Sequence, residues 1–166
     1  CKLYKIASYE ITDLKLIRYI ASKKKPIIVS TGMATVKEIK NAIKEIKRYH
    51  NKIIILHCVS SYPTKLKDIN LEKINKLKLL YKDCLVGLSD HTDNIISSIA
   101  SMPFKVIAIE KHFNIDDNIK TVDSSFSINE KFLKNLKTFS VSLHQSFNKK
   151  IINVEKINKN LRRSIF

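Results

Sequence analysis

The sequence predicts an α/β protein with an all-parallel sheet of the (β/α)8 barrel type. Short apolar runs alternate with longer stretches of helical periodicity along most of the chain. Each apolar run is followed at once by hydroxyl, imidazole or charged side chains. In a (β/α)8 barrel the carboxyl ends of the strands form one face, where such side chains converge on one site. An open doubly wound sheet would carry a glycine-rich phosphate turn after its first strand, and the sequence has none there.

Five apolar runs are the predicted strands, at residues 3–7, 26–29, 53–56, 85–88 and 106–109. Each is too short for a helix, and several are apolar throughout, as expected of parallel strands that are buried on both faces. The polar segments that follow them are SYE at 8–10, STG at 30–32, HCVS at 57–60, SDH at 89–91 and EKH at 110–112.

Five stretches have the spacing of helices, at residues 12–24, 35–49, 70–82, 92–102 and 127–147. Thr35 with Glu38, and Ser127 with Glu130, have the spacing of a capping box at a helix start. The second predicted helix carries its apolar residues on one face, with lysines opposite. These residues are Val36, Ile39, Ala42, Ile43 and Ile46. Strands and helices therefore alternate throughout, which favours parallel pairing.

Length and composition fit one ordinary domain, since 166 residues with 44% hydrophobic content can bury a core. No apolar run approaches the roughly 20 residues that cross a membrane, and no signal-peptide pattern opens the chain. The three cysteines share no C-x-x-C spacing, which argues against a disulfide framework or a thiolate zinc site and fits a reducing cytoplasm. Because the chain opens on Cys1 rather than methionine, close to a strand-like run, we expect it to be a fragment.

The chain is strongly basic, with 31 Lys and Arg against 15 acids and a formal charge of +16. Such a charge suggests a nucleic-acid or anionic-surface partner. Only four of the basic residues are arginines, however, and phosphate and base recognition tends to favour arginine. Because the lysines are spread along the chain, we interpret them as solvated helix faces and expect no nucleic acid and no membrane as partner.

Five motifs carry a resemblance to a known family. The segments YKIASYEITDLKLI, KKPIIVSTGMAT, IILHCVSSYPT, VGLSDHT and IEKHF resemble, in order and spacing, the sialic acid synthase family of phosphoenolpyruvate-dependent N-acetylneuraminate, legionaminate and pseudaminate synthases. The resemblance implies that residues 1–147 are about strands four to eight of a (β/α)8 catalytic barrel, and that 148–166 lead toward an antifreeze-like domain. It implies a homodimer for the full-length protein. The first and last strands should then be exposed edges.

Two histidines predict a metal site. His91 and His112 follow neighbouring strands, where two imidazoles could share one divalent ion and leave positions for water and substrate. The resemblance implies that both are catalytic and that the ion is Mn²⁺, with Mg²⁺ or Co²⁺ possible. The alternative is a pair of structural or solvent-exposed histidines. We expect Asp90 to orient His91, and Thr92 to open the next helix.

Lys5, Ser30, Ser60 and Ser89 are the residues that the resemblance places around phosphoenolpyruvate. A trianionic substrate needs a positive charge and several donors, and a lysine with hydroxyls from adjacent strands supplies both. Lys5 lies inside an apolar strand, where an unpaired charge is costly, and this favours a functional reading. Each serine alone would by default be a turn hydroxyl, and many relatives have asparagine at the position of Ser60.

Glu10, Tyr62, Asp123 and His57 are candidates for the sugar side. A glutamate just beyond a strand end can act as general acid or base near an aldehyde. Tyr62 and Asp123 resemble residues that hold the acylated amino sugar, although Tyr62 could instead pack against a proline. Asp123 follows Thr-Val, whereas relatives usually have a Gly-Pro-Asp turn. His57 resembles a substrate-facing residue, with a satisfied core histidine as the alternative.

The resemblance implies a condensation of phosphoenolpyruvate with the open-chain form of an N-acetylated amino-sugar aldehyde, giving a nine-carbon 2-keto acid and phosphate. A catalytically silent relative and a basic nucleic-acid-binding module are the alternatives. The sequence leaves open which acylated sugar is the acceptor.

Overall fold

The computed structural model describes residues 1–147 and confirms an α/β fold with a parallel sheet. Five strands pair in chain order, β1-β2-β3-β4-β5, and curl into half of a barrel. They are β1 (Tyr4–Ile6), β2 (Ile27–Ser30), β3 (Ile53–Cys58), β4 (Leu85–Asp90) and β5 (Ile109–Lys111). Within the described residues, β1 and β5 each pair with one neighbour only, so the predicted exposed edges are present.

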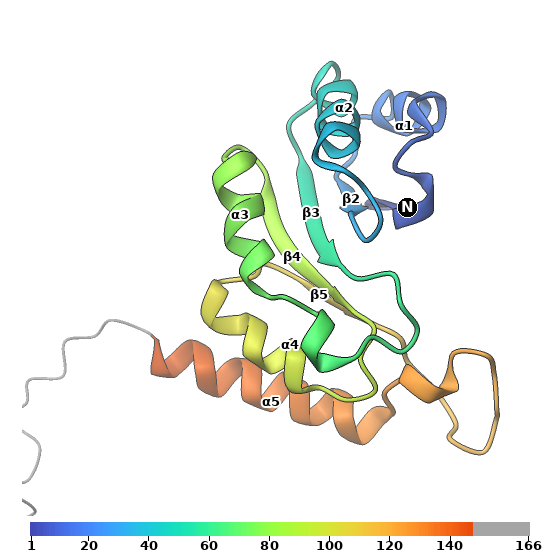
Figure 1. The fold of residues 1–166 in the computed structure, drawn as a ribbon, viewed down its shortest axis with the longest axis vertical. Helices are drawn as coiled ribbons and strands as arrows, with labels where there is room; N and C mark the ends of the chain where they lie inside the picture. The colour runs from blue at the N-terminus through green and yellow to red at the C-terminus, as the bar shows by residue number, and fades with distance from the viewer. Residues whose placement is uncertain (148–166) are drawn as a thin grey trace, which may run out of the picture.

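One α-helix follows each strand, as expected of repeated βα units. The helices are α1 (Leu14–Ala21), α2 (Val36–Lys47), α3 (Glu72–Leu80), α4 (Ile96–Ser101) and α5 (Glu130–Ser146). Figure 1 shows α1 and α2 side by side, and α4 lying against α5. None of these described helices is long and apolar enough to span a membrane.

The core lies between the sheet and the helices. Ile6, Ile27 and Ile55 from the strands and Ile17 and Ile46 from the helices are all fully buried. Burying each such side chain stabilises the fold by about 1.5–3 kcal/mol. The predicted apolar face of α2 is confirmed except at its first position, Val36, which is 60% exposed.

The start of the second helix is as predicted, but the starts of three later elements, α4, β5 and α5, differ. The hydroxyl of Thr35 accepts from the Glu38 amide, and Glu38 accepts from the Thr35 amide in return. The second predicted capping box is wrong, because Asn129 caps α5 and the Ser127 hydroxyl donates to the carbonyl of Asp123. The Ser127 hydroxyl bonds to a nearby turn carbonyl and therefore does not cap the helix.

The fourth helix and the fifth strand begin later than predicted. Thr92 does not open α4, because its amide and hydroxyl both donate to Asp90, and the helix starts at Ile96. The fifth strand is Ile109–Lys111 instead of 106–109. In the pairing of β4 with β5, Ser89 lies opposite Glu110. The two strands are therefore paired through the polar residues at their carboxyl ends. The predicted linker at 148–166 lies outside the described residues.

Candidate active site

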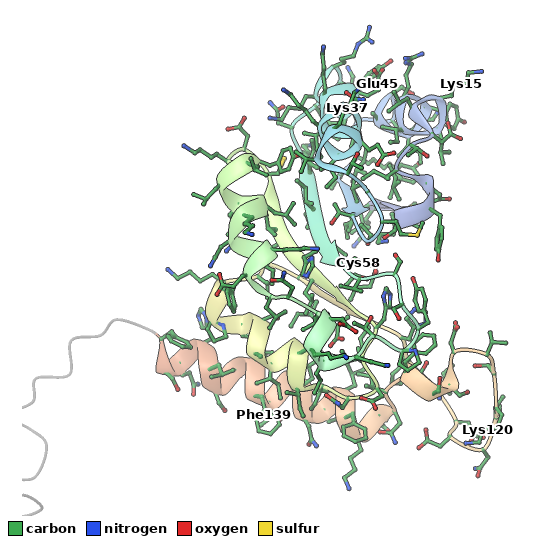
Figure 2. The ribbon with its side chains drawn as sticks, viewed as in Figure 1. Lys15, Lys37, Glu45, Cys58, Lys120 and Phe139 are labelled. Carbon is green, nitrogen blue, oxygen red and sulfur yellow. The ribbon has the colours of Figure 1, made fainter. Side chains whose placement is uncertain are left out.

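A cavity of about 200 Å³ lies at the carboxyl ends of the strands. It brings together six of the predicted site residues, and the other lining residues were not predicted. The lining consists of Lys5, Ala7, Ser8, Tyr9, Ser30, Cys58, Tyr62, Ser89, His91, Glu110 and His112. Figure 2 labels Cys58, which marks this end of β3. Two larger hollows, of 450 and 270 Å³, lie between α5 and the segment before β5 and contain none of the predicted residues.

The two histidines face one another across part of this cavity. Their ring centroids are 5.3 Å apart. Nδ1 of His91 lies 3.0 Å from the carbonyl oxygen of Val59, which can only accept, so we assign the proton to Nδ1. His91 Nε2 then carries the lone pair; the Ser89 hydroxyl lies 3.5 Å from it and donates to Glu110 at a shorter distance, so this lone pair is available to a ligand. A backbone carbonyl behind a metal-binding histidine is a common arrangement.

His112 is held in a similar way by a carboxylate. Its Nδ1 lies 3.4 Å from Oδ2 of Asp123, which again leaves Nε2 as the available nitrogen. Burial, together with the neighbouring His91, lowers the pKa of His112 and favours the neutral imidazole that binds metals. The structure thus places Asp123 behind a histidine, outside the residues that line the cavity.

Tyr62 forms an aromatic wall beside both histidines. Its ring centroid lies 4.3 Å from that of His91 and 6.1 Å from that of His112. Phe126 closes the cluster, 5.3 Å from Tyr62 and 4.8 Å from His112. Burial raises the pKa of Tyr62, so its hydroxyl stays protonated near neutral pH. Tyr62, Phe126 and the two imidazoles thus form one aromatic cluster beside the cavity.

An ion pair crosses the cavity between the two edge strands. Nζ of Lys5 on β1 lies 3.6 Å from Oε1 of Glu110 on β5. The hydroxyl of Ser89 donates to the same oxygen at 2.7 Å. Glu110 has no role predicted from the sequence. It lies in β5, two residues before His112, which follows the strand directly, and both residues line the cavity.

Two buried hydroxyls near the cavity lack a partner within the described residues. They are Ser30 Oγ, on the cavity wall, and Ser60 Oγ behind it. An unpaired buried polar group costs about 1–3 kcal/mol, which a bound ligand with acceptor oxygens would recover. Gly32 permits this crowding, since a Cβ there would lie 2.1 Å from Ser60 Oγ and 2.9 Å from Ser8 Oγ.

Besides Asp123 and Ser60, two more predicted residues lie away from the cavity wall. The carboxylate of Glu10 is exposed and accepts from the amide of Ala7 at 2.7 Å, where it closes a short 3₁₀ turn. His57 is 2% exposed, and its Nε2 lies 2.6 Å from the carbonyl oxygen of Ile69. This environment fits the alternative of a satisfied core histidine. A catalytic role for Glu10 stays a prediction.

The prediction that Asp90 orients His91 through a direct contact is wrong, because the His91 ring bonds to the Val59 carbonyl instead. The Asp90 carboxylate accepts from the amide and hydroxyl of Thr92 and from Ser97 and Ser98, and it pairs with Lys111. Burial alone would raise the pKa of Asp90, but the hydrogen bonds and the Lys111 charge outweigh it and lower that pKa. Burial lowers the pKa of Lys111. Because strand side chains alternate, Asp90 points away from the cavity.

The donor set fits an ion held by two protein ligands. No group of three His, Cys, Asp or Glu side chains within residues 1–147 has the geometry of a metal site. His91 and His112 nevertheless each have Nδ1 engaged and Nε2 available, beside a polar cavity. Such a pair leaves several coordination positions for water and substrate.

Comparisons with known proteins find relatives over most of this chain. A pseudaminic acid synthase of Helicobacter pylori is 43% identical over 129 residues, which are 77% of this chain and 38% of that protein. An N,N'-diacetyllegionaminic acid synthase of Campylobacter jejuni is 39% identical, over 82% of this chain and 42% of that protein. The chain therefore spans about two fifths of the length of these relatives.

A solved structure shares the fold of nearly the whole chain. It is the N-acetylneuraminic acid synthetase of Leptospira borgpetersenii, with a TM-score of 0.85 and 29% identity over 99% of this chain and 56% of that one. The model of the NeuB family matches residues 1–151. This match includes all five strands and the residues that line the cavity. The chain therefore belongs to the NeuB family.

Proposed function

We propose that this chain provides the catalytic face of a synthase that condenses phosphoenolpyruvate with an N-acetylated amino-sugar aldehyde. The product is a nine-carbon 2-keto acid of the nonulosonic type, and phosphate is released. The observation that carries the proposal is one cavity that combines two imidazoles, each with Nε2 available, with a lysine and several hydroxyls. The names of the relatives, pseudaminic and legionaminic acid synthases, support this reaction class.

The phosphoenolpyruvate side is built from Lys5, Ser30 and Ser89, with Ser60 behind Gly32. The Glu110 carboxylate holds Lys5 and Ser89. An incoming anion takes over these donors and displaces Glu110. The unpartnered Ser30 hydroxyl supplies a further donor.

The aldehyde side is built around the histidine pair. His91 and His112 would hold a divalent ion, Mn²⁺ in first place and Mg²⁺ or Co²⁺ as alternatives. When bound, the ion would polarise the aldehyde oxygen as a Lewis acid. Tyr62 positions the sugar against the imidazoles, and Asp123 fixes the His112 ring.

The reaction requires a new C–C bond and the loss of phosphate. The methylene carbon of phosphoenolpyruvate attacks the aldehyde carbon, and the aldehyde oxygen takes up a proton to become a hydroxyl. Water adds at the cationic C2 and loses a proton; the C–O bond to phosphate then breaks, and the C2 hydroxyl gives up its proton to leave the 2-keto group. Glu110 is the one carboxylate among the residues that line the cavity, and we assign to it the proton of that water. Holding two small polar molecules face to face supplies much of the rate.

The test uses the full-length protein that contains this chain. Phosphoenolpyruvate labelled with ¹⁸O at the bridging oxygen is incubated with Mn²⁺ and a panel of N-acetylated amino-sugar aldehydes. We expect aldehyde-dependent release of phosphate that carries the label, because the C–O bond breaks. No phosphate release with any aldehyde, together with retained phosphoenolpyruvate binding, would identify the second candidate, a catalytically silent relative.

The second candidate rests on the altered loop before Asp123. Thr121 and Val122 precede this acid, whereas the family resemblance leads us to expect Gly-Pro there. We expect the complete protein to act in the cytoplasm as a homodimer. A basic nucleic-acid module would instead show salt-dependent retention on DNA or heparin.

A further inference from the structure

The buried ion pair of Asp90 and Lys111 lies directly beside the two histidines. The residues are paired in register on neighbouring strands, Asp90 on β4 and Lys111 on β5. Nζ of Lys111 lies 3.5 Å from Oδ1 of Asp90, and the two side chains are 4% and 0% exposed. His91 and His112 are the next residues along each chain segment. The pair therefore joins the two segments at the point where each delivers its imidazole.

The pair contacts the scaffold and not the cavity. Neither residue lines the cavity, whereas their neighbours Ser89 and Glu110 both do, as the alternation of strand side chains requires. On the outer face, Asp90 accepts from Ser97 and Ser98 of α4. The pair thus ties β5 to β4 and β4 to the helix layer without touching the proposed substrate.

Lys111 holds the His91 segment on both sides. Its ammonium pairs with Asp90, the residue before His91, and donates to the carbonyl of Thr92, the residue after it. His112 follows Lys111 directly in the chain. A shift of one histidine relative to the other would break at least one of these contacts, and a buried charge without its partner is strongly disfavoured.

We propose that Asp90 and Lys111 are positioning residues that set the separation of His91 and His112, and with it the affinity for a divalent ion. The inference rests on the proposed function, in which these imidazoles share one ion. Removing partners that orient metal ligands typically weakens metal affinity about 10–100-fold. We expect loss of this pair to weaken binding of the divalent ion and to leave the binding of phosphoenolpyruvate unchanged.

The test replaces Lys111 in the full-length protein that contains this chain. Lys111→Met removes the ammonium and keeps an unbranched stem. We expect the Kd for Mn²⁺, measured from the electron paramagnetic resonance signal of the free ion, to rise about 10–100-fold. The Kd for phosphoenolpyruvate, measured without added metal, should stay within about twofold, since Lys111 does not line the cavity.

Lys111→Met leaves the buried Asp90 carboxylate without its partner charge and could therefore misfold. The double variant Asp90→Asn/Lys111→Met removes both charges of the pair and avoids this problem. It should show the same selective loss of Mn²⁺ affinity. The matched control is Lys78→Met, since the Lys78 ammonium also donates to backbone carbonyls, those of Phe104 and Lys105. Lys78 is on α3, away from the cavity, and the control should bind Mn²⁺ as the wild type does.

A second readout does not depend on metal. In the metal-free protein, ¹⁵N spectra of the histidine rings should show altered His91 and His112 signals in both Lys111 variants and not in Lys78→Met. Unchanged Mn²⁺ affinity and ring signals in both variants, or an equal loss in the control, would overturn the inference. If the wild type binds no Mn²⁺ while the ring signals still respond to Lys111, the proposed metal role fails and the positioning role stands.

Discussion

The carboxylate of Glu110 holds two cavity side chains that we expect to bind an anion. It engages the Lys5 ammonium and the Ser89 hydroxyl, two of the donors that we assign to phosphoenolpyruvate. A carboxylate of the protein thus stands where a carboxylate or phosphate of the substrate would bind. Ligand and side chain compete for the same donors.

Glu110→Gln should therefore separate binding from turnover. Removing the charge weakens the competition, and because a partly exposed ion pair is worth about 0–1 kcal/mol, we expect the Kd for phosphoenolpyruvate to fall by up to about fivefold. Turnover should fall, since the cavity loses its carboxylate. Calorimetric titration and a phosphate-release assay measure the two effects. The control is Glu130→Gln, which removes the exposed Glu130–Lys134 pair at the start of α5. Weaker phosphoenolpyruvate binding in Glu110→Gln would contradict the prediction.

His112→Ala tests the metal ligand itself. Losing one of two protein ligands should weaken Mn²⁺ binding more than loss of an orienting partner does, by at least about 100-fold. Titration of Mn²⁺ at constant protein concentration measures the change. His144→Ala, on the exposed face of α5, should bind Mn²⁺ normally. An unaltered Mn²⁺ affinity in His112→Ala would remove this histidine from the proposed site.

At the scale of elements, helix starts and helix pairs decide how firmly the scaffold holds the site. The α2 start has a complete capping box, and α2 is joined to α1 by a short ion pair from Arg18 Nε to Glu45, 2.8 Å long. Figure 2 shows Glu45 on α2, well away from Cys58 at the end of β3. Changes there should alter stability and leave ligand binding intact.

Thr35→Ala should lower the free energy of unfolding by about 1 kcal/mol, within a range of about 0.5–2. The loss comes from the Glu38 amide, which no longer has its side-chain acceptor. Urea denaturation followed by circular dichroism measures it. Thr12→Ala, in an exposed turn, should change the unfolding free energy by less than about 0.5 kcal/mol. Equal effects in the two variants would mean that the cap contributes nothing.

The Arg18–Glu45 pair predicts a pH dependence of stability. The hydrogen bond from Arg18 outweighs burial and lowers the pKa of Glu45 below its ordinary value of 4.5. A carboxyl with a lowered folded-state pKa stabilises the fold above its unfolded-state pKa, and this contribution is lost as the pH falls below about 4.5. Glu45→Gln should thus have a lower Tm than the wild type at neutral pH, and the difference should shrink below that value. A Tm difference between Glu45→Gln and the wild type that is constant with pH would be inconsistent with this account.

At the scale of the whole molecule, the cavity joins the two edges of the sheet. Lys5 is on β1 and Glu110 on β5, and within the described residues each of these strands has only one neighbour. A ligand that engages Lys5, Ser30 and Ser89 contacts β1, β2 and β4 at once. Binding should therefore stabilise the arrangement of the strands as a whole.

Phosphoenolpyruvate at about 100 times its Kd should raise the unfolding free energy by about 2.7 kcal/mol through mass action. Thermal denaturation with and without the ligand measures this as an increase in Tm. Lys5→Met should abolish most of the increase, because the ligand loses its charged donor, whereas Lys2→Met, at an exposed position before β1, should keep it. A full increase in Lys5→Met would mean that Lys5 does not bind the anion.

Local signals made most of the elements predictable. Apolar runs bounded by polar ends located the first four strands, and the Thr35–Glu38 spacing located the start of α2, because both depend on residues close in sequence. Three predicted boundaries were wrong, at Ser127, at Thr92 and at 106–109. At each of them a hydrogen bond or strand pairing in the folded chain fixes where the helix or strand begins. Thr92, for example, has a hydroxyl that suits a helix cap, but it bonds to Asp90 in the folded chain.

The sequence by itself determined the alternation of strands and helices, and the polar strand ends that had to meet at one face, since parallel strands deliver their carboxyl ends together. Only the tertiary structure decided which of those side chains share the cavity. His57 and Asp90 stand among the same strand ends as His91, yet they turn to the carbonyl of Ile69 and to Lys111. Lys5 and Glu110 lie 105 residues apart in the chain and meet only because the sheet curls. Which face a side chain takes, and which distant partner satisfies it, follows from strand register and curvature, which no local pattern encodes.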